Sequence, residues 1–274
     1  MLAPIRSKSL IFDIYGAFVR DLGGWIAIAD LITLMGDLGV EEQPVRSSVS
    51  RMTRKGLLTR HELNGQAGYV LSLRAQEILA EGDSRIYLQQ EIASVADGWT
   101  LVTFSVPETM RAERHQLRSR LRWLGYGNVG AGLWIAPSRT YERTIEMVRS
   151  SGLARYVDVF RATYAAFGDL DELVQRCWDL DQVRRAYRLY WAEFEPMAES
   201  WSSTEPRNDP RSAFRDYVSA LHRWRKLPYL DPGLPPELLP SDWEGKIATD
   251  LFNELRGRLE PSAQVHVASV MSTP

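Results

Sequence analysis

A short basic segment carries most of the residues that could recognise another molecule. From Arg46 to His61 the sequence holds five basic residues and no acidic one, namely Arg46, Arg51, Arg54, Lys55 and Arg60. Arginine side chains can read guanine edges or hold phosphates, and the short hydroxyls of Ser47 and Ser50 permit close approach to a duplex. This combination predicts contact with DNA.

A helix over residues 40–55 is expected to present these side chains on one face. Glu41, Glu42 and Pro44 suit a helix N-terminus, and Gly56 suits the position just after its C-terminus. Apolar residues recur at helical spacing and would face a core. They are Val45, Val49 and Met52.

A β-hairpin is expected directly after this helix. Residues 57–63 and 69–73 alternate like strands, and residues 64–68 supply turn residues between them. Two earlier helices, over residues 9–21 and 25–38, would form the scaffold beneath the basic helix. A basic helix alone could equally be a solvated surface helix. The ordered combination favours a winged helix-turn-helix.

The predicted roles divide the basic residues of this region. We expect base-edge contacts from Arg46, Ser47, Ser50 and Arg51. We expect phosphate contacts from Arg54, Lys55 and Arg60. Two further DNA-binding candidates, His61 and Asn64, would lie on or near the wing.

Length and composition limit the remaining function classes. A chain of 274 residues suggests two or three domains, and a net charge of −2 confines any DNA contact to a local patch. The single cysteine, Cys177, excludes an intrachain disulfide and a cysteine-based zinc site. The four histidines lie far apart, and neither a signal peptide nor a membrane-spanning run is evident. A cytoplasmic protein without metal or cofactor is expected.

The remaining elements predict an α+β protein. Residues 99–164 follow the order β-α-β-β-α-β of a ferredoxin-like fold. From residue 168 onward the chain is expected to be helical, with a helix stopping near Pro196 and fraying from Pro261. The expected domains are 1–85, a winged helix; 97–166, ferredoxin-like; and 167–274, helical.

Two other groups of residues admit more than one interpretation. The helix over residues 109–124 is rich in arginine; it could meet DNA or ligand phosphates, although a solvated face is the simpler interpretation. Aromatic residues and arginines of the last third favour core and dimer packing, or a pocket for an anionic aromatic ligand. The candidates for that pocket are Arg184, Tyr187, Arg188, Trp191, Arg223 and Trp224.

Four stretches together resemble the PaaX family of bacterial transcriptional repressors. They are residues 23–25, 45–52, 130–137 and 227–243. The resemblance implies a homodimeric regulator with an N-terminal winged helix, a central domain similar to Cas2 and a helical C-terminal domain. It also implies repression of phenylacetate catabolism, with release from DNA by phenylacetyl-coenzyme A. Arginines beside aromatics suit such an aryl-coenzyme A effector, because its phosphates require cations.

The likeness to Cas2 raises the alternative of a metal-dependent nuclease. Cas2-type nucleases place a metal-binding aspartate at the end of the first strand. Here that strand ends in Phe104-Ser105-Val106-Pro107, without a carboxylate as a hard oxygen ligand. We therefore expect no enzyme activity. A module that binds an acidic protein through the basic helix is the other alternative.

Overall fold

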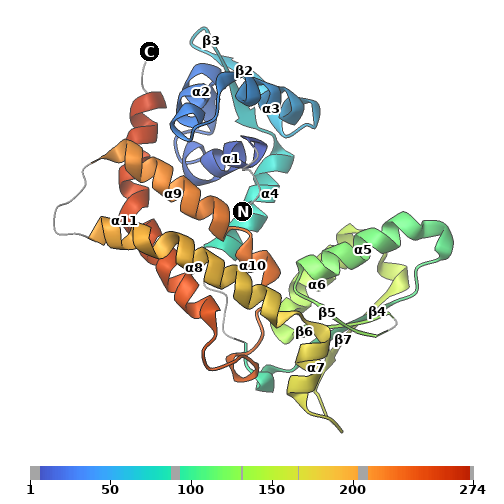
Figure 1. Ribbon diagram of the computed structural model, residues 1–274. Coiled ribbons are helices and arrows are strands. Elements are labelled where there is room, and N and C mark those ends of the chain that lie inside the picture. The colour runs from blue at the N-terminus through green and yellow to red at the C-terminus, as the bar shows by residue number, and fades with distance from the viewer. Residues whose placement is uncertain (1–6, 88–92, 131, 166, 203–208, 272–274) are drawn as a thin grey trace. The chain divides into compact units, whose positions relative to one another are not determined.

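The computed structural model describes residues 7–87, 93–130, 132–165, 167–202 and 209–271 (Figure 1). Its mixture of helices and antiparallel sheets confirms the predicted α+β class. By contacts the chain forms two compact units. The first unit comprises Met1–Leu88, Tyr190–Arg225 and Ile247–Pro274, and the second comprises Gln89–Leu189 and Lys226–Lys246. The three-domain division stays a prediction, and each unit is described by itself.

The first unit begins with four helices around a small sheet. The helices are α1 (Ser7–Ile14), which continues as the π-helix η1 (Tyr15–Val19), α2 (Ile28–Asp37), α3 (Glu42–Arg54) and α4 (Leu73–Ile86). The second helix was expected to start at Trp25, but Trp25–Ala27 forms strand β1. The reason is that Gly23 and Gly24 adopt positive φ angles of 96° and 79° and turn the chain toward a strand partner.

The small sheet has the strand order β1-β3-β2 and is antiparallel. Its longer strands are β2 (Leu58–Leu63) and β3 (Gln66–Leu71). Asn64 and Gly65, with φ angles of 51° and 76°, form a two-residue hairpin loop, the geometry that suits the twist of paired strands. The turn expected over residues 64–68 is therefore shorter, because β3 already begins at Gln66.

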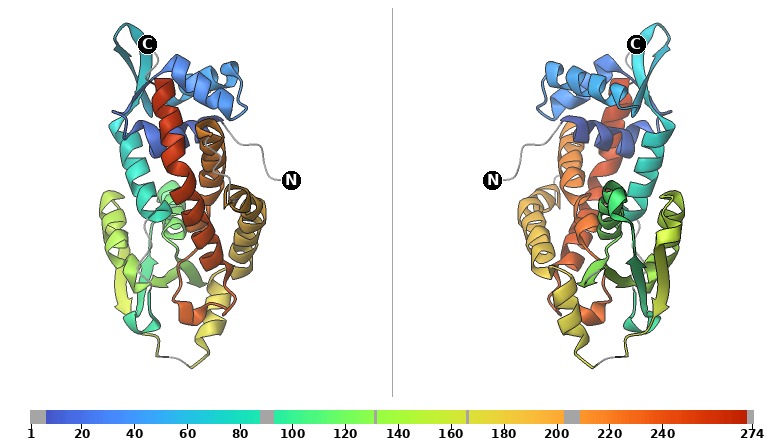
Figure 2. Two further views of the ribbon diagram at one scale, coloured as in Figure 1. Left: turned by 90° about the vertical axis from the view of Figure 1, so that its left-hand side faces the viewer. Right: turned by 90° about the vertical axis from the view of Figure 1, so that its right-hand side faces the viewer.

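Three long helices complete the first unit. They are the C-terminal part of α8 (Leu180–Ser202), α9 (Pro210–Trp224) and most of α11 (Glu244–Met271). Figure 2 shows α11 running beside α4 and α9. The ring of Phe252 on α11 stacks on Trp224, with centroids 4.8 Å apart, and on Tyr87 after α4.

Two helices continue through prolines that were expected to end them. Pro196 lies inside α8, and Pro261 lies inside α11, which extends to Met271. Buried side chains on both sides hold each helix together, among them Phe194 and Ala198 in α8. In α11, Leu259 and Ala263 are fully buried. Tertiary packing thus outweighs the hydrogen bond lost at each proline.

The second unit contains a four-stranded antiparallel sheet of order β5-β6-β4-β7. Its elements are β4 (Trp99–Phe104), α5 (Arg111–Trp123), β5 (Gly127–Gly130), β6 (Leu133–Pro137), α6 (Tyr141–Ser150) and β7 (Val157–Ala162). This confirms the predicted β-α-β-β-α-β order. Leu117 and Leu121 of α5 pack with Val148 of α6 in one core cluster with Val102 and Trp134 of the sheet.

A second core cluster lies against other residues of that sheet. Trp99 and Ile135 pack there against Leu173 and Val174 of α7 (Leu170–Cys177) and against Leu234. The remaining short elements are α10 (Leu227–Leu230) and the 3₁₀ turns η2 (Val95–Asp97), η3 (Glu108–Met110), η4 (Ser138–Thr140), η5 (Ala154–Tyr156) and η6 (Pro236–Leu238). Among the described helices, none has the length and apolar character needed to cross a membrane.

Candidate nucleic-acid interface

Helix α3 separates an apolar face from a cationic one. Val45, Val49 and Met52 are buried, as predicted, together with Ser48. After the last turn Gly56 adopts a φ of 64°, its N–H donates to Thr53 O at 2.9 Å, and Leu57 N–H donates to Met52 O at 3.0 Å. These two bonds end the helix in the manner usual for a glycine at this position.

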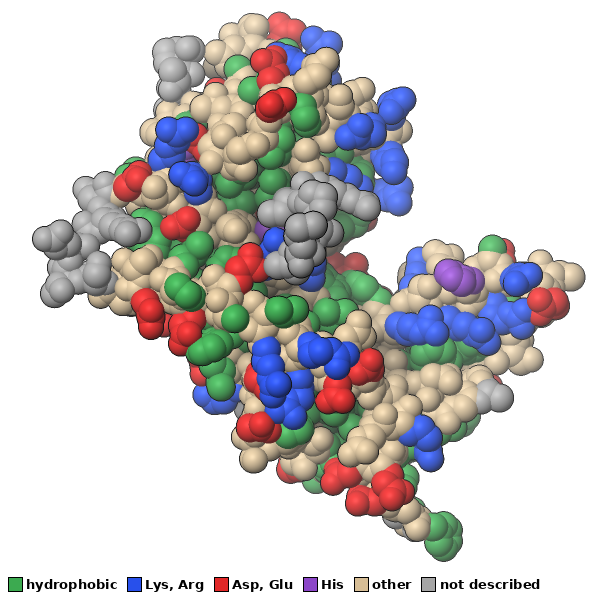
Figure 3. All heavy atoms as spheres, viewed as in Figure 1, with side chains coloured by type: hydrophobic (Ala, Val, Ile, Leu, Met, Phe, Trp, Pro, Cys, Tyr) green, Lys and Arg blue, Asp and Glu red, His purple; other side chains and the backbone are tan. Residues whose placement is uncertain are grey.

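The other face of α3 is open to solvent over its full length. All of its predicted DNA-binding residues are exposed: Arg46, Ser47, Ser50, Arg51, Arg54 and Lys55. Figure 3 shows Lys and Arg side chains gathered over this helix. Thr53 is also exposed here and was not predicted; its hydroxyl donates to Val49 O at 3.0 Å.

Two arginines of this face have partners within the helix. Arg51 Nη2 donates to Ser48 Oγ at 3.0 Å, and Ser48 is only 1% exposed. A buried hydroxyl thus holds one edge of the guanidinium and leaves its other N–H groups for a ligand. Arg46 Nε donates to Glu42 Oε1 at 2.6 Å, so a base contact by Arg46 requires exchange of that carboxylate. This pair was not predicted, although its spacing of four residues is the pattern that could have indicated it.

The hairpin presents the other candidates beside this helix. Arg60, His61 and Asn64 are exposed, with Asn64 in the two-residue loop. Ser72 joins the hairpin end to α3, because its hydroxyl donates to Gly56 O at 2.7 Å and accepts from Ala75 N–H at 3.2 Å. The same side chain therefore caps α4 and fixes the end of α3.

Trp25 supports the hairpin from β1, a role that the sequence did not indicate. Its indole Nε1–H donates to His61 O at 2.9 Å. A β-carbon added to Gly68 would lie 2.4 Å from Cε2 of the same indole. Only glycine therefore lets the ring lie against β3.

Gly68→Ala is expected to displace this indole and destabilise the first unit by about 1–3 kcal/mol, the usual cost of overpacking. Urea unfolding measures the loss, and amide hydrogen exchange locates it in β1 and β3. Gly36→Ala is the matched control, because Gly36 lies in α2 with open space around the added methyl group. Equal stability of the two variants would contradict the role of Trp25.

Two aspartates with buried side chains join the scaffold of α3 to the C-terminal helices of the first unit. Asp13 of α1 lies 2.6 Å from His222 Nδ1 and 2.9 Å from Arg225 Nε. Asp37, the last residue of α2, lies 2.6 Å from Arg211 Nε and 2.7 Å from His266 Nε2. Asp13 thus contacts His222 of α9 and Arg225, the residue after α9. Asp37 contacts Arg211 of α9 and His266 of α11. Neither aspartate cluster was predicted, because its members lie far apart in the sequence.

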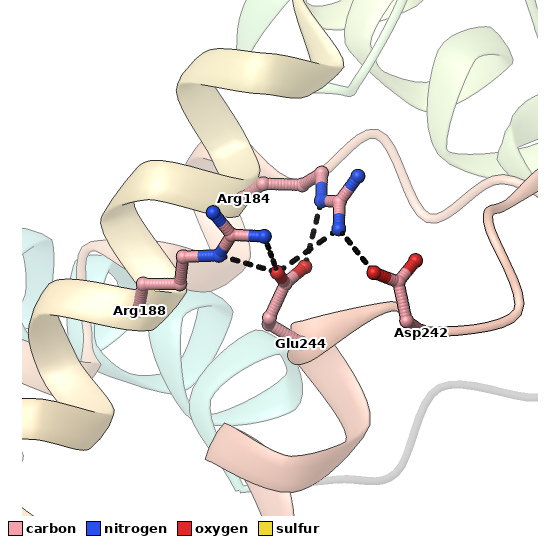
Figure 4. Close-up of polar contacts among 4 residues, drawn as sticks. All are labelled: Arg184, Arg188, Asp242 and Glu244. Atoms are coloured by element: carbon pink, nitrogen blue, oxygen red, sulfur yellow. Dashed lines mark hydrogen bonds and ion pairs between the residues drawn. The ribbon is translucent and has the colours of Figure 1, made fainter.

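The six effector candidates do not form one cluster within either unit. Arg184, Tyr187 and Arg188 belong to the second unit; Trp191, Arg223 and Trp224 belong to the first. Arg184 Nε donates to Glu244 Oε2 and its Nη2 to Asp242 Oδ2, both at 2.8 Å. Arg188 also contacts Glu244, and Figure 4 shows both guanidinium groups converging on this carboxylate. These cations are therefore already neutralised by acids.

Of the other candidates, some are buried in the core or paired with an acid, and one is partly exposed. Tyr187 is buried and donates to Asp231 Oδ2 at 2.8 Å. Trp224 is buried and its Nε1–H donates to Ile86 O at 3.1 Å, whereas Trp191 is 39% exposed. Arg223 Nε lies 3.4 Å from Glu193 Oε1. The effector role of this set stays a prediction.

Glu244→Gln is expected to lower the stability of the fold at neutral pH and to make that stability depend less on pH in the acid range. The Arg184 hydrogen bonds, with smaller help from Arg188, lower the pKa of Glu244 from 4.5 to about 2. A depressed carboxyl pKa stabilises the fold above the unfolded value and loses that effect as pH falls. Between pH 4.5 and about 2 the variant should therefore take up about one proton fewer on unfolding.

Denaturant unfolding at a series of pH values measures this difference. The free energy of unfolding of the variant should fall less steeply as the pH is lowered. Glu142→Gln, which removes the same charge from an exposed pair with Arg161, is the control for charge alone. Parallel curves for parent and Glu244→Gln would contradict the assignment.

The end of strand β4 bears on the nuclease alternative. Phe104 ends the strand and Ser105 follows. In the part of the chain that the structure describes, no group of three His, Cys, Asp or Glu side chains could hold a metal ion.

Comparison with known proteins places the chain in a family. Models described as PaaX-like protein, PaaX protein central Cas2-like domain and PaaX-like protein C-terminal domain match residues 6–75, 93–174 and 178–269. The chain is 26% identical over 268 residues to the transcriptional repressor PaaX of Escherichia coli K12, covering 97% of this chain and 84% of that protein.

A solved structure has the same fold. It is that of the uncharacterized protein Rv0674 from Mycobacterium tuberculosis, with a TM-score of 0.64 and 20% sequence identity over 96% of this chain and 98% of the other. Three successive domain matches and the near full-length relative agree with one another. The chain therefore belongs to the PaaX family, the family of that transcriptional repressor.

Proposed function

We propose that this chain is a sequence-specific DNA-binding transcriptional repressor that responds to a ligand. The observation that carries the proposal is the exposed, arginine-rich face of α3 beside the β2–β3 hairpin. Membership in the family of a transcriptional repressor supports the same function.

In this proposal the first unit acts as a winged helix. Helix α3 enters the major groove, α2 supports it, and the hairpin is the wing. Arg51 and Ser50 face base edges, whereas Arg54 and Lys55 hold phosphates. In a homodimer two such helices would read half-sites about 34 Å apart.

The proposed effector is an aryl-coenzyme A thioester such as phenylacetyl-coenzyme A, and the proposed target is an operon for phenylacetate-type catabolism. Arg184 and Arg188 could bind anionic phosphates only by exchanging Glu244 and Asp242 for them. Such an exchange is a discrete change at the start of α11, which gives the ligand different affinities for two states. Differential affinity is what release from DNA requires.

Selection from a random duplex library tests the proposal and yields the operator sequence in the same experiment. The selected duplex is then titrated by fluorescence anisotropy with and without phenylacetyl-coenzyme A. Acetyl-coenzyme A and free phenylacetate serve as matched controls for the two halves of the ligand. Enrichment of a sequence whose binding is lost only with the thioester supports both parts.

Two other outcomes separate the parts of the proposal. Sequence-preferring binding that ignores the thioester keeps the DNA function and overturns this effector. No enrichment at any salt concentration overturns the DNA function and favours the protein-interaction alternative.

A further inference from the structure

The second unit carries a basic surface that the proposed function does not use. Arg111, His115, Arg118 and Arg122 of α5 are all exposed. At 3.6 residues per turn these four positions fall within about 60° of the helix circumference. They are named the α5 stripe here. Figure 3 shows Lys and Arg side chains gathered along α5.

The stripe is free of acidic side chains, whereas the neighbouring helix is not. The acidic residue of α5, Glu113, lies on nearly the opposite side of the helix, since two residues advance it by about 200° from Arg111. Helix α6 alternates Glu142, Arg143, Glu146 and Arg149 and has no net charge from these residues. The positive charge of the stripe is therefore particular to α5 and is not shared by the exposed helix α6 of the same unit.

Several arginines elsewhere in the chain pair with a carboxylate. Arg20, Arg184, Arg211, Arg225 and Arg256 all form such pairs. On α5 the pair is that of Arg114 with Glu108. Within the described residues, no carboxylate lies at ion-pair distance from Arg111, Arg118 or Arg122.

One end of the stripe is held in place by packing. The guanidinium carbon of Arg122 lies 5.5 Å from the ring centroid of Trp134, a buried residue of β6. Such a cation–π contact fixes a cation at the surface without neutralising its charge. Leu117 and Leu121 anchor the helix below it.

We propose that the α5 stripe binds the phosphate backbone of duplex DNA outside the sequence that α3 reads. The inference rests on the proposed DNA-binding function and adds a second contact surface to it. From position 111 to position 122 the stripe spans about 16 Å of helix. Duplex DNA presents one phosphate charge per about 1.7 Å, so several phosphates lie within that span. Arginines and an acid-free face suit this polyanion, and the contact carries no sequence preference.

The test compares the full-length chain with the variant Arg111→Gln/Arg118→Gln. Binding is titrated at several salt concentrations on two duplexes, a short one that ends at the selected site and a longer one with flanking DNA. Each lost phosphate contact lowers the salt slope by about 0.9. The double variant should lose about 1.8 of the slope on the longer duplex and bind it roughly 10- to 100-fold more weakly near ~0.1 M salt.

A matched control removes the same charge from the same unit. Arg149→Gln/Arg176→Gln changes two exposed arginines away from the stripe and should retain the parental slope. Both double variants should fold as the parent does, because each altered side chain is exposed. Circular-dichroism melting checks this. The ratio of affinities for selected and scrambled flanked duplexes should stay parental in the α5 variant.

The outcomes distinguish this inference from the proposed function. A parental slope and affinity in the α5 variant overturn the inference, whatever α3 does. Parental DNA binding combined with weaker release by phenylacetyl-coenzyme A overturns it in favour of a contact with the ligand's phosphates. Salt-dependent binding that needs α5 but shows no sequence preference supports the inference and overturns the proposed operator recognition.

Discussion

Asp13→Asn is expected to destabilise the first unit by roughly 3 kcal/mol, because it removes the negative charge from a buried network. The side chains of Asp13 and His222 are each 2% exposed, and that of Arg225 is 24% exposed. Loss of the carboxylate leaves the Arg225 cation without its counter-charge in a poorly solvated position. Because a quarter of Arg225 reaches water, the lower end of the usual 3–5 kcal/mol range applies.

Denaturant unfolding measures this loss, and Asp83→Asn is the matched control. Asp83 pairs with Arg20 in the same unit, but those side chains are 34% and 26% exposed. Its loss should cost no more than about 1 kcal/mol. A double-mutant cycle of Asp13→Asn with Arg225→Gln isolates the pair. Equal costs at Asp13 and Asp83 would show that burial does not control this network.

The network of Asp13 with His222 and Arg225 also connects stability with the proposed function. Helix α1 contacts both α3 and α9. The Asp13 variant should therefore bind DNA less well even below its unfolding transition, because α3 loses part of its support. Asp37, paired with Arg211 and His266, holds α2 in the same manner. The charge pairs of Asp13 and Asp37 thus hold α1 and α2, the helices that support α3, in place within the first unit.

Local sequence patterns predicted the elements that carry their own signals. The apolar spacing of Val45, Val49 and Met52 placed the buried face of α3, and Gly56 placed its end. The Asn64-Gly65 pair marked the hairpin, although the loop proved shorter than expected. In the second unit the alternation of helices and strands was sufficient to predict the order of the elements along the chain. These features depend on residues close together in the chain.

Features formed by distant residues were missed or misplaced. Strand β1 has only three residues and exists because β3 pairs with it. Helices α8 and α11 pass through Pro196 and Pro261 because buried neighbours compensate for the lost bond. For the site, the sequence indicated the arginines of α3 but neither the support of Trp25 nor the buried hydroxyl of Ser48. It also gave no sign that Glu244 neutralises Arg184 and Arg188.

Arg51→Ala is expected to weaken binding to the selected duplex by about 1–3 kcal/mol, roughly 5- to 150-fold. The residue is exposed on the open face of α3, and Ser48 Oγ holds one edge of its guanidinium at 3.0 Å. A side chain held in this way loses less freedom when it binds a base edge. The loss should be largest for the selected sequence and small for a scrambled duplex, so sequence preference falls.

Two matched variants separate the contributions of Arg51. Arg51→Lys keeps the charge but loses the planar fork, so it should retain binding to scrambled DNA and lose preference at one base pair. Arg54→Gln should instead weaken both duplexes alike and lower the salt slope by about 0.9. Ser48→Ala should cause a smaller loss than Arg51→Ala, because it removes only the support of the guanidinium. If Arg51→Ala binds the selected duplex as the parent does, α3 is not the helix that reads the operator.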